Sequence, residues 1–504
     1  MKTLTAKISG NEIRQSVDDA VSDFSAPSEV LDSWAGNFTL KKEEGSTKGL
    51  RNPQVGAYHS IISHWTFTNQ IGTVVLPTGT GKTETMLSVF VSERLGKLLV
   101  IVPSDPLRSQ ISKKFIHLGL LRDLTLLPET AANPVVGTIK KGFASEAELS
   151  AFLGKCNVVV ATASIISRIG SGYSDLLRDK FTHVFIDEAH HTEANSWNKI
   201  RNLFTGKYII QFTATPFRND NKKIDGKIIY TYPLKKAQEE GYFKPIKFEK
   251  IYEYNTKNKD RALAEKGIEQ LRIDKQNYAH ILLARVGTKK RADEVFEIYN
   301  EYSPEFRVVK IYSGLGVRES KEIQRKIVGL EVDIIVCVDM LGEGFDLPNL
   351  KIAVFHDIRQ SLPITLQFVG RFTRTSYDAE LGDATIIANL ADIDVNDELD
   401  ALYARDPDWN VILPLLSERR TQSEIDLYNF IEGFRDNEDF PVSIQSIKPA
   451  LSAVVYKNQT DSWFPTNYLK GFSNPESYEL IRHNYNQDER VLVVVTVRKL
   501  PAEW

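Results

Sequence analysis

The octapeptide LPTGTGKT, residues 76–83, decides the fold of this chain. It follows a short apolar run at 72–76 and precedes a helix-like stretch, which is the setting of a phosphate-binding loop. Glycines in such a loop let backbone N–H groups converge on phosphates at a helix N-terminus. The strict pattern starts with glycine, where this chain has Leu76. A chance Gly/Thr turn is the alternative, and the flanking elements argue against it.

The residue types in this loop predict a nucleotide site with a magnesium ion. Lys82 is expected to reach the β- and γ-phosphates, and Thr83 is expected to hold Mg²⁺. The implied cofactors are therefore ATP and Mg²⁺. The nucleotide-binding residues expected from the loop are Thr78, Gly79, Thr80, Gly81, Lys82 and Thr83.

Short apolar runs, separated by amphipathic stretches, continue outward from the loop. Such runs are typical of a parallel sheet with helices on both faces. The pattern starts a second time after residue 262, so the sequence predicts an α/β fold with two tandem parallel-sheet domains. The expected strands are at 72–76, 98–102, 157–161, 183–186 and 208–212, and at 281–284, 308–311, 333–337, 352–355 and 384–388.

Two further motifs supply the charges that ATP hydrolysis needs. In DEAH, Asp187 is expected to complete the Mg²⁺ coordination and Glu188 to polarise the attacking water. In QFVGRFTR, Arg371 and Arg374 lie one helical turn apart and suit an arginine finger. The alternatives are a solvated helix start for DEAH and surface ion pairing for the two arginines.

In their order along the chain, these motifs resemble those of the superfamily 2 helicases and translocases. The resemblance covers about residues 50–390 and implies two RecA-like domains with ATP bound between them. The motif sequences DEAHH, TATPFR and GEGFDLP most resemble those of the DNA-directed branch. That branch contains excision-repair helicases, restriction-enzyme motor subunits and phage-defence helicases. The matching stretches are LRNPQ at 50–54, then 76–83, 100–110, 158–164, 187–190, 213–218, 281–295, 339–348 and 367–374.

The resemblance also implies roles for residues by their place in these motifs. Arg51 and Gln54 look like the adenine-recognition element, and Gly344 and Asp346 hold ATP-side positions. The implied catalytic residues are Glu188, Arg371, Arg374, Gln367 and His190.

A nucleic-acid track is implied on the face away from ATP. Small hydroxyls and N–H groups that touch phosphates suit stepping along any sequence, because phosphate contacts carry no base information. For each single Ser or Thr, an ordinary helix cap is an equal alternative. The implied contacts are Ser104, Arg108, Thr162, Thr288 and Ser313.

Two departures from the family pattern bear on strand separation. Val338 precedes Asp339, where many members have a Thr that touches the nucleic-acid backbone. Only 18 residues separate Pro348 from Gln367, too few for a long strand-separating hairpin. These departures favour ATP-driven movement over true unwinding. No basic patch interleaved with aromatics is evident, so base stacking is not predicted.

The formal net charge of −3 over 504 residues hides an uneven distribution. Residues 1–377 hold 52 basic and 43 acidic groups, whereas residues 378–439 hold 4 and 17. The part of this acidic segment at 392–439 is predicted to be helical, and three interpretations stay open: a solvated connection, a surface that restrains the basic motor, and a partner-binding surface. The two cysteines cannot form a disulfide framework and are expected to be buried thiols.

The division of the chain follows from these patterns. Without a signal-peptide core or a bilayer-length apolar stretch, the sequence predicts a soluble cytoplasmic protein. Residues 1–45 are expected to be an extension with a helix-like stretch around 13–30. The expected domains are 46–235 and 236–391, each RecA-like, followed by an accessory region at 392–504 with a β-like run at 489–500, which suggests a truncated or compact form.

The leading hypothesis is an ATP-dependent DNA helicase or translocase, of the kind that drives a restriction, repair or phage-defence system. Its partners would be DNA, single-stranded or with a single-stranded region, and a protein such as a nuclease effector. Two alternatives stay open. One is an RNA helicase, and the other is an ATP-gated subunit that senses DNA and controls a partner.

Overall fold

The computed structural model divides the chain into two compact units, each described by itself. The first holds Met1–Asn219 and Ile224–Glu418, and the second holds Asp220–Lys223 and Arg419–Trp504. The residues that the structure describes are 1–188, 194–214, 226–255, 257–312, 314–338, 347–357, 370, 372–373, 381–391, 416–419, 421–423, 425–426, 429, 462–471, 478–488 and 490–498.

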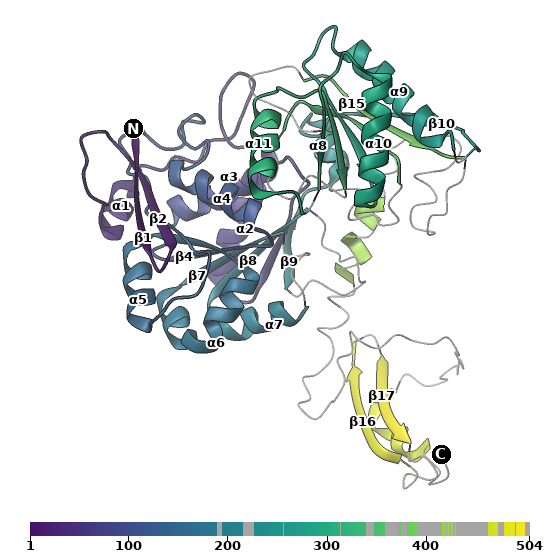
Figure 1. The fold of residues 1–504 in the computed structure, drawn as a ribbon. Coiled ribbons are helices and arrows are strands. Elements are labelled where there is room, and N and C mark those ends of the chain that lie inside the picture. Colours follow the sequence, from purple (N-terminus) through teal and green to yellow (C-terminus); the bar gives the residue numbers. More distant parts are fainter. Residues whose placement is uncertain are drawn as a thin grey trace. The chain divides into compact units, whose positions relative to one another are not determined.

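The first unit contains a nine-stranded sheet in the order β1-β2-β5-β6-β4-β7-β8-β3-β9 (Figure 1). Its strands pair in parallel except for β1 with β2 and β2 with β5. The carboxyl ends of all the parallel strands therefore lie at one edge. The bounds are β1 Lys2–Ile8, β2 Asn11–Val17, β3 Gly72–Val75, β4 Leu98–Val102, β5 Val136–Thr138, β6 Val158–Thr162, β7 His183–Asp187, β8 Tyr208–Thr213 and β9 Lys227–Thr231.

Helices cover both faces of this sheet, because its central strands are apolar on both sides. Leu98 and Val100 of β4 belong to one core cluster, and Leu99 and Ile101 belong to another. This period of two places an apolar layer on each face. The helices are α1 Pro27–Trp34, α2 Asn52–Phe67, α3 Lys82–Ser92, α4 Asp105–His117, α5 Glu146–Lys155, α6 Ala163–Lys180 and α7 Ala194–Leu203.

A second, six-stranded sheet follows, in the order β10-β15-β14-β11-β13-β12, with every pair parallel. Its strands are β10 Ile246–Ile251, β11 Ile281–Val286, β12 Val308–Ile311, β13 Ile334–Val338, β14 Leu350–Phe355 and β15 Ala384–Asn389. The helices are α8 Leu234–Glu239 in the connection between the sheets, α9 Lys259–Asp274, α10 Lys289–Tyr302 and α11 Val317–Val328.

All ten strands that the apolar runs predict are present, and two RecA-like α/β domains are confirmed. The predicted boundary at 235/236 falls within α8, between the last strand of one sheet and the first of the next. Both cysteines are free and buried, as expected.

The helix expected around 13–30 is wrong over most of its length, because residues 18–26 are not helical and α1 begins only at Pro27. Residues Asn11–Val17 form β2, which pairs with β1 and β5 and extends the first sheet. The buried Gln15 side chain donates to the Asn133 carbonyl at 2.8 Å and accepts from the Ser25 N–H at 2.9 Å. These partners lie elsewhere in the chain, so local polarity could not show that the segment is a strand.

The second unit contains an antiparallel pair, β16 Tyr478–Asn486 and β17 Val491–Arg498, and a 3-10 helix at Pro465–Gly471. The β-like run predicted at 489–500 is therefore confirmed over β17. Most of the acidic segment lies outside the described residues, and its described pieces between 416 and 429 are helical. Across the described ranges, no helix is both long and apolar enough to cross a membrane.

Candidate active site and nucleic-acid interface

The loop 76–83 connects β3 to the first turn of α3, as the sequence predicts. Gly79 and Gly81 have φ of +88° and +94°, in the left-handed region that favours glycine. A Cβ atom on Gly81 would lie 1.9 Å from Nε2 of Gln54. Thr80 closes the turn by donating from its N–H and its hydroxyl to the Pro77 carbonyl, at 3.2 and 2.7 Å. The loop thus presents the N-terminus of α3, which favours phosphate.

Leu76, at the position of the usual leading glycine, is compatible with this geometry. Its backbone φ is not positive, and its side chain is fully buried in the core. Its N–H donates to the Thr213 carbonyl of β8 at 2.9 Å. The position therefore extends the strand pairing and does not require glycine.

The second half of the site follows β7 at the same edge of the sheet. β8 lies between β3 and β7, so the loop after β3 and the DEAH segment after β7 are close neighbours. Nζ of Lys82 forms a short ion pair with Oε1 of Glu188, and both side chains are largely buried. Asp187 is 4% exposed, and its Oδ1 accepts the Glu188 N–H at 3.1 Å. The lysine and both carboxylates that the sequence assigned to the ATP site are therefore together.

The N-terminus of α2 contacts the phosphate-binding loop through Arg51 and Gln54. Oε1 of Gln54 accepts the Arg51 N–H at 2.7 Å, and its Nε2 donates to the Gly81 carbonyl at 3.2 Å. Arg51 donates from Nη1 to the Gly79 carbonyl at 3.0 Å. Both side chains of the expected adenine-recognition element thus bind carbonyls of the loop.

Tyr242 is a neighbour of this element that sequence reasoning missed. The Arg51 guanidinium lies 5.2 Å from the centroid of its ring, and its hydroxyl donates to a Glu43 carboxylate. Burial, and then the hydrogen bond to Glu43, raise the pKa of Tyr242. A lone tyrosine between two α/β patterns carries no local signal for this role.

The residues present fit a Mg²⁺–nucleotide. Mg²⁺ is usually held by one or two carboxylates together with substrate phosphates and waters. Within the described ranges, no cluster of three or more His, Cys, Asp or Glu side chains could hold a metal by itself. Asp187 and the Thr83 hydroxyl, beside a loop shaped for phosphates, match that sparse protein contribution.

Several residues that the sequence assigned lie outside the described residues. The phosphate-side and catalytic roles implied for them stay predictions. They are His190, Gly344, Asp346, Gln367, Arg371, Arg374 and, among the nucleic-acid contacts, Ser313.

The other expected nucleic-acid contacts lie where strands end and helices begin. Ser104, Thr162 and Thr288 are the N-cap residues of α4, α6 and α10, and Arg108 lies in the first turns of α4. Only the Thr288 side chain makes a cap hydrogen bond, accepting the Arg291 N–H at 3.3 Å. The Ser104 hydroxyl is buried without a hydrogen-bond partner among the described residues. Thr288 is therefore a helix cap with its side-chain hydrogen bond formed, whereas Ser104 only occupies the N-cap position.

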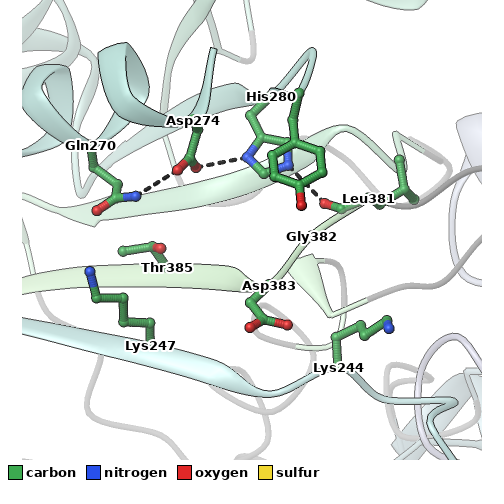
Figure 2. Close-up of a pocket in the computed structure, with 10 residues that line it drawn as sticks. Lys244, Lys247, Gln270, Asp274, His280, Leu381, Gly382, Asp383 and Thr385 are labelled. Atoms are coloured by element: carbon green, nitrogen blue, oxygen red, sulfur yellow. Dashed lines mark hydrogen bonds and ion pairs between the residues drawn. The ribbon is translucent and has the colours of Figure 1, made fainter. Parts of the chain in front are cut away.

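A separate pocket of about 390 Å³ lies at the amino-terminal edge of the second sheet (Figure 2). Buried His280 contacts Asp274 through Nδ1 and the Leu381 carbonyl through Nε2, each at 2.7 Å. Lys244, Lys247 and Asp383 also line the pocket. Since Thr288 follows the carboxyl end of β11, this pocket is at the opposite edge from the candidate nucleic-acid contacts.

Comparison with protein families finds two matches in this chain. Residues 47–218 match the family described as type III restriction enzyme, res subunit. Residues 262–376 match the helicase conserved C-terminal domain. The first region contains β3 to β8 of the first sheet, and the second contains β11 to β14 of the second sheet, so each sheet lies mainly in one of the two paired domains of a helicase.

Individual relatives are distant. The chain is 24% identical over 355 residues to DNA 3'-5' translocase XPB2 of Sulfurisphaera tokodaii, covering 60% of this chain and 74% of that protein. It is 23% identical over 380 residues to helicase 22 of Sulfolobus islandicus filamentous virus, covering 66% of this chain and 63% of the viral protein. The chain thus spans less than two thirds of that viral relative.

Among solved structures, the fold is similar to a fragment of an HsdR subunit of a type I restriction enzyme from Vibrio vulnificus YJ016. The TM-score is 0.53 at 19% identity, covering 77% of this chain and 70% of that one. At this identity the likeness concerns the fold alone.

Proposed function

Because this chain belongs to the superfamily 2 helicases of the restriction and repair type, we propose that it is an ATP-dependent motor that moves on DNA. The observation that carries the proposal is the ion pair between Lys82 and Glu188. It joins the phosphate-binding loop to the DEAH segment at one edge of the first sheet. The lysine proposed to bind the phosphates and the carboxylate proposed to activate the water are therefore in direct contact.

The geometry suggests how these residues act. Lys82 leaves Glu188 and turns to the β- and γ-phosphates, so the carboxylate is released to orient the attacking water. Thr83 and Asp187 would hold Mg²⁺, which would supply positive charge to neutralise the phosphates. Gln54 and Arg51, already bound to loop carbonyls, contact the base side of the nucleotide. Arg371 and Arg374 of the second domain complete the proposed site.

DNA is the proposed track, with Ser104, Arg108, Thr162 and Thr288 as phosphate contacts. The sequences of the motifs support DNA over RNA as the track, as does the similarity to a DNA 3'-5' translocase. The proposed biological role is movement on DNA in restriction, repair or phage defence, in the cytoplasm. The match of residues 47–218 to a restriction-enzyme subunit supports the first of these.

The test is ATP turnover by the full chain alone, with single-stranded DNA, with duplex DNA and with RNA. We expect DNA to raise turnover more than RNA does. Equal turnover in all four conditions would refute a nucleic-acid-coupled motor. Stronger stimulation by RNA than by DNA would favour the RNA helicase.

A second candidate is an ATP-gated subunit that senses DNA and controls a partner effector. The match of residues 47–218 to a family of restriction-enzyme subunits favours it. It predicts DNA binding that depends on the bound nucleotide, without displacement of a roadblock on the DNA. A streptavidin-displacement assay with biotinylated DNA separates it from a translocating motor, which removes the roadblock.

A further inference from the structure

The segment that follows β10 presents two tyrosines to solvent. Tyr252 is 47% exposed and Tyr254 is 76% exposed. Exposed aromatic rings on a soluble protein are a common means of binding unpaired bases, since every base has a stacking face. In the stretch KIYEYNTKNKDR at 250–261, basic residues flank the two tyrosines on both sides, a pattern that sequence reasoning did not recognise as a patch.

The backbone beneath these rings is held firmly by a buried asparagine. Asn389, 2% exposed at the end of β15, accepts the Glu253 N–H at 3.0 Å and donates to the Glu253 carbonyl at 2.8 Å. The Leu390 N–H donates to the Ile251 carbonyl at 2.9 Å. The tyrosines on either side of Glu253 are thus displayed from an anchored backbone, which lowers the entropy cost of binding.

The segment ends beside the candidate nucleic-acid contact Thr288. Asp260, in the first turn of α9, accepts two hydrogen bonds from Arg291 of α10, each at 2.7 Å. The Arg291 N–H is in turn the cap partner of Thr288. The N-termini of α9 and α10 are therefore joined, at the edge of the sheet where β10 and β11 both end.

The charge at this place suits a polyanion. Between 250 and 261 there are four basic residues and two acidic ones, and both carboxylates are engaged. Glu253 accepts the Asn255 N–H at 2.7 Å, and Asp260 binds Arg291 and His356. Two helix N-termini add positive potential for phosphates.

We propose that Tyr252 and Tyr254, with Lys257 and Lys259, form a base-stacking platform that binds single-stranded nucleic acid next to Thr288. The tyrosine rings stack on unpaired bases, and the lysines contact the phosphates between them. This platform rests on the proposed function, because it extends the same track. It adds stacking interactions with unpaired bases, which phosphate contacts at helix N-termini do not provide.

The test uses two fluorescent oligonucleotides of equal length and charge, oligo(dT) and the same backbone without bases. We expect Tyr254→Ala in the full chain to weaken oligo(dT) binding about 5- to 100-fold and to leave binding of the abasic strand at the wild-type level. Tyr254→Phe keeps a stacking face and should bind oligo(dT) like the wild type. Lys257→Ala should weaken both strands equally and reduce the salt dependence by about one phosphate contact.

The matched control is Phe67→Ala, since Phe67 is 85% exposed at the end of α2, a helix that packs on α3 and on β3 and β9 of the first sheet. It should bind both strands like the wild type, and thermal unfolding should confirm that all variants are folded. Oligo(dT) binding that Tyr254→Ala leaves unchanged, or an equal loss on the abasic strand, would overturn the platform alone. If the wild type binds neither strand and no nucleic acid stimulates ATP turnover, both the platform and the proposed motor are wrong.

Discussion

The ammonium of Lys82 and the carboxylate of Glu188 form an ion pair across 106 positions of sequence. The lysine is expected to bind phosphate and the glutamate to activate water, and in this structure the two side chains bind each other. The pair places the group proposed to bind phosphate directly beside the group proposed to activate water.

The first prediction concerns Glu188→Gln. Without the carboxylate, Lys82 loses its charged partner, so ATP should bind as tightly as in the wild type or up to about tenfold more tightly, while turnover falls at least about 100-fold. Equilibrium binding of a fluorescent ATP analogue and a steady-state ATPase assay measure the two effects. Lys82→Ala is the control, and it should lose both binding and turnover. Retained hydrolysis in Lys82→Ala would overturn the assignment of the site.

The second prediction concerns the left-handed glycine of the loop. Gly81→Ala should cost about 1–2 kcal/mol of stability from its φ of +94° and should also weaken ATP binding, because the new methyl group meets Gln54. Gly36→Ala is a matched control, since Gly36 has φ +71° and open space around it. Calorimetry and nucleotide titration would show a stability loss in both variants and a binding loss in Gly81→Ala only. Equal ATP affinity in the two would argue against the close packing of Gln54 on the loop.

The third prediction separates capping from nucleic-acid contact. Thr288→Val removes a cap hydrogen bond and should lower stability by about 1 kcal/mol in addition to weakening DNA binding. Ser104→Ala removes no cap hydrogen bond and should weaken DNA binding with little change in stability. Unfolding midpoints and DNA anisotropy titrations give the two readouts. Thr288→Ser retains the hydroxyl and should keep both the stability and the DNA affinity of the wild type. If neither Thr288→Val nor Ser104→Ala changes the DNA affinity, these residues are not nucleic-acid contacts.

The fourth prediction is a pH dependence that arises from Lys351 in β14. Burial, and then the charge of Lys244, lower the pKa of Lys351 to about 8, and its Nζ donates to the Phe372 carbonyl at 2.8 Å. Between pH 8 and the ordinary lysine pKa near 10.5, the unfolded chain binds more protons than the folded chain. Stability should therefore rise with pH across this window, by at most about 3 kcal/mol.

Lys351→Met removes this titrating group and serves as the comparison. Urea midpoints of both proteins at pH 7, 8, 9 and 10 should diverge, with the wild type gaining stability relative to the variant as the pH rises. Parallel curves would show that Lys351 titrates in the folded protein as it does in the unfolded one.

The strands and the phosphate-binding loop could be predicted because their signals are local. Runs such as Leu98–Val102 are short and apolar on both faces, and amphipathic helical stretches flank them, which favours strands between two helical layers. The loop has a left-handed backbone at Gly79 and Gly81, and glycine at a position indicates such a conformation because it has no Cβ atom.

Features that depend on distant partners could not be predicted in the same way. The N-terminal segment reads as polar and helix-like, yet β2 is a strand because β5 and Asn133 offer it partners. Tyr242 beside Arg51, and the exposure of Tyr254, depend equally on which elements meet in space.

The sequence by itself determined two α/β domains, a nucleotide loop and the chemical groups for hydrolysis, since residue type and spacing along the chain encode these. Only the tertiary structure decided that Lys82 pairs with Glu188, which depends on β8 lying between β3 and β7. It likewise brought the N-termini of α9 and α10 together through Asp260 and Arg291. Strand order and helix packing are set by long-range burial, so they decide which charges meet.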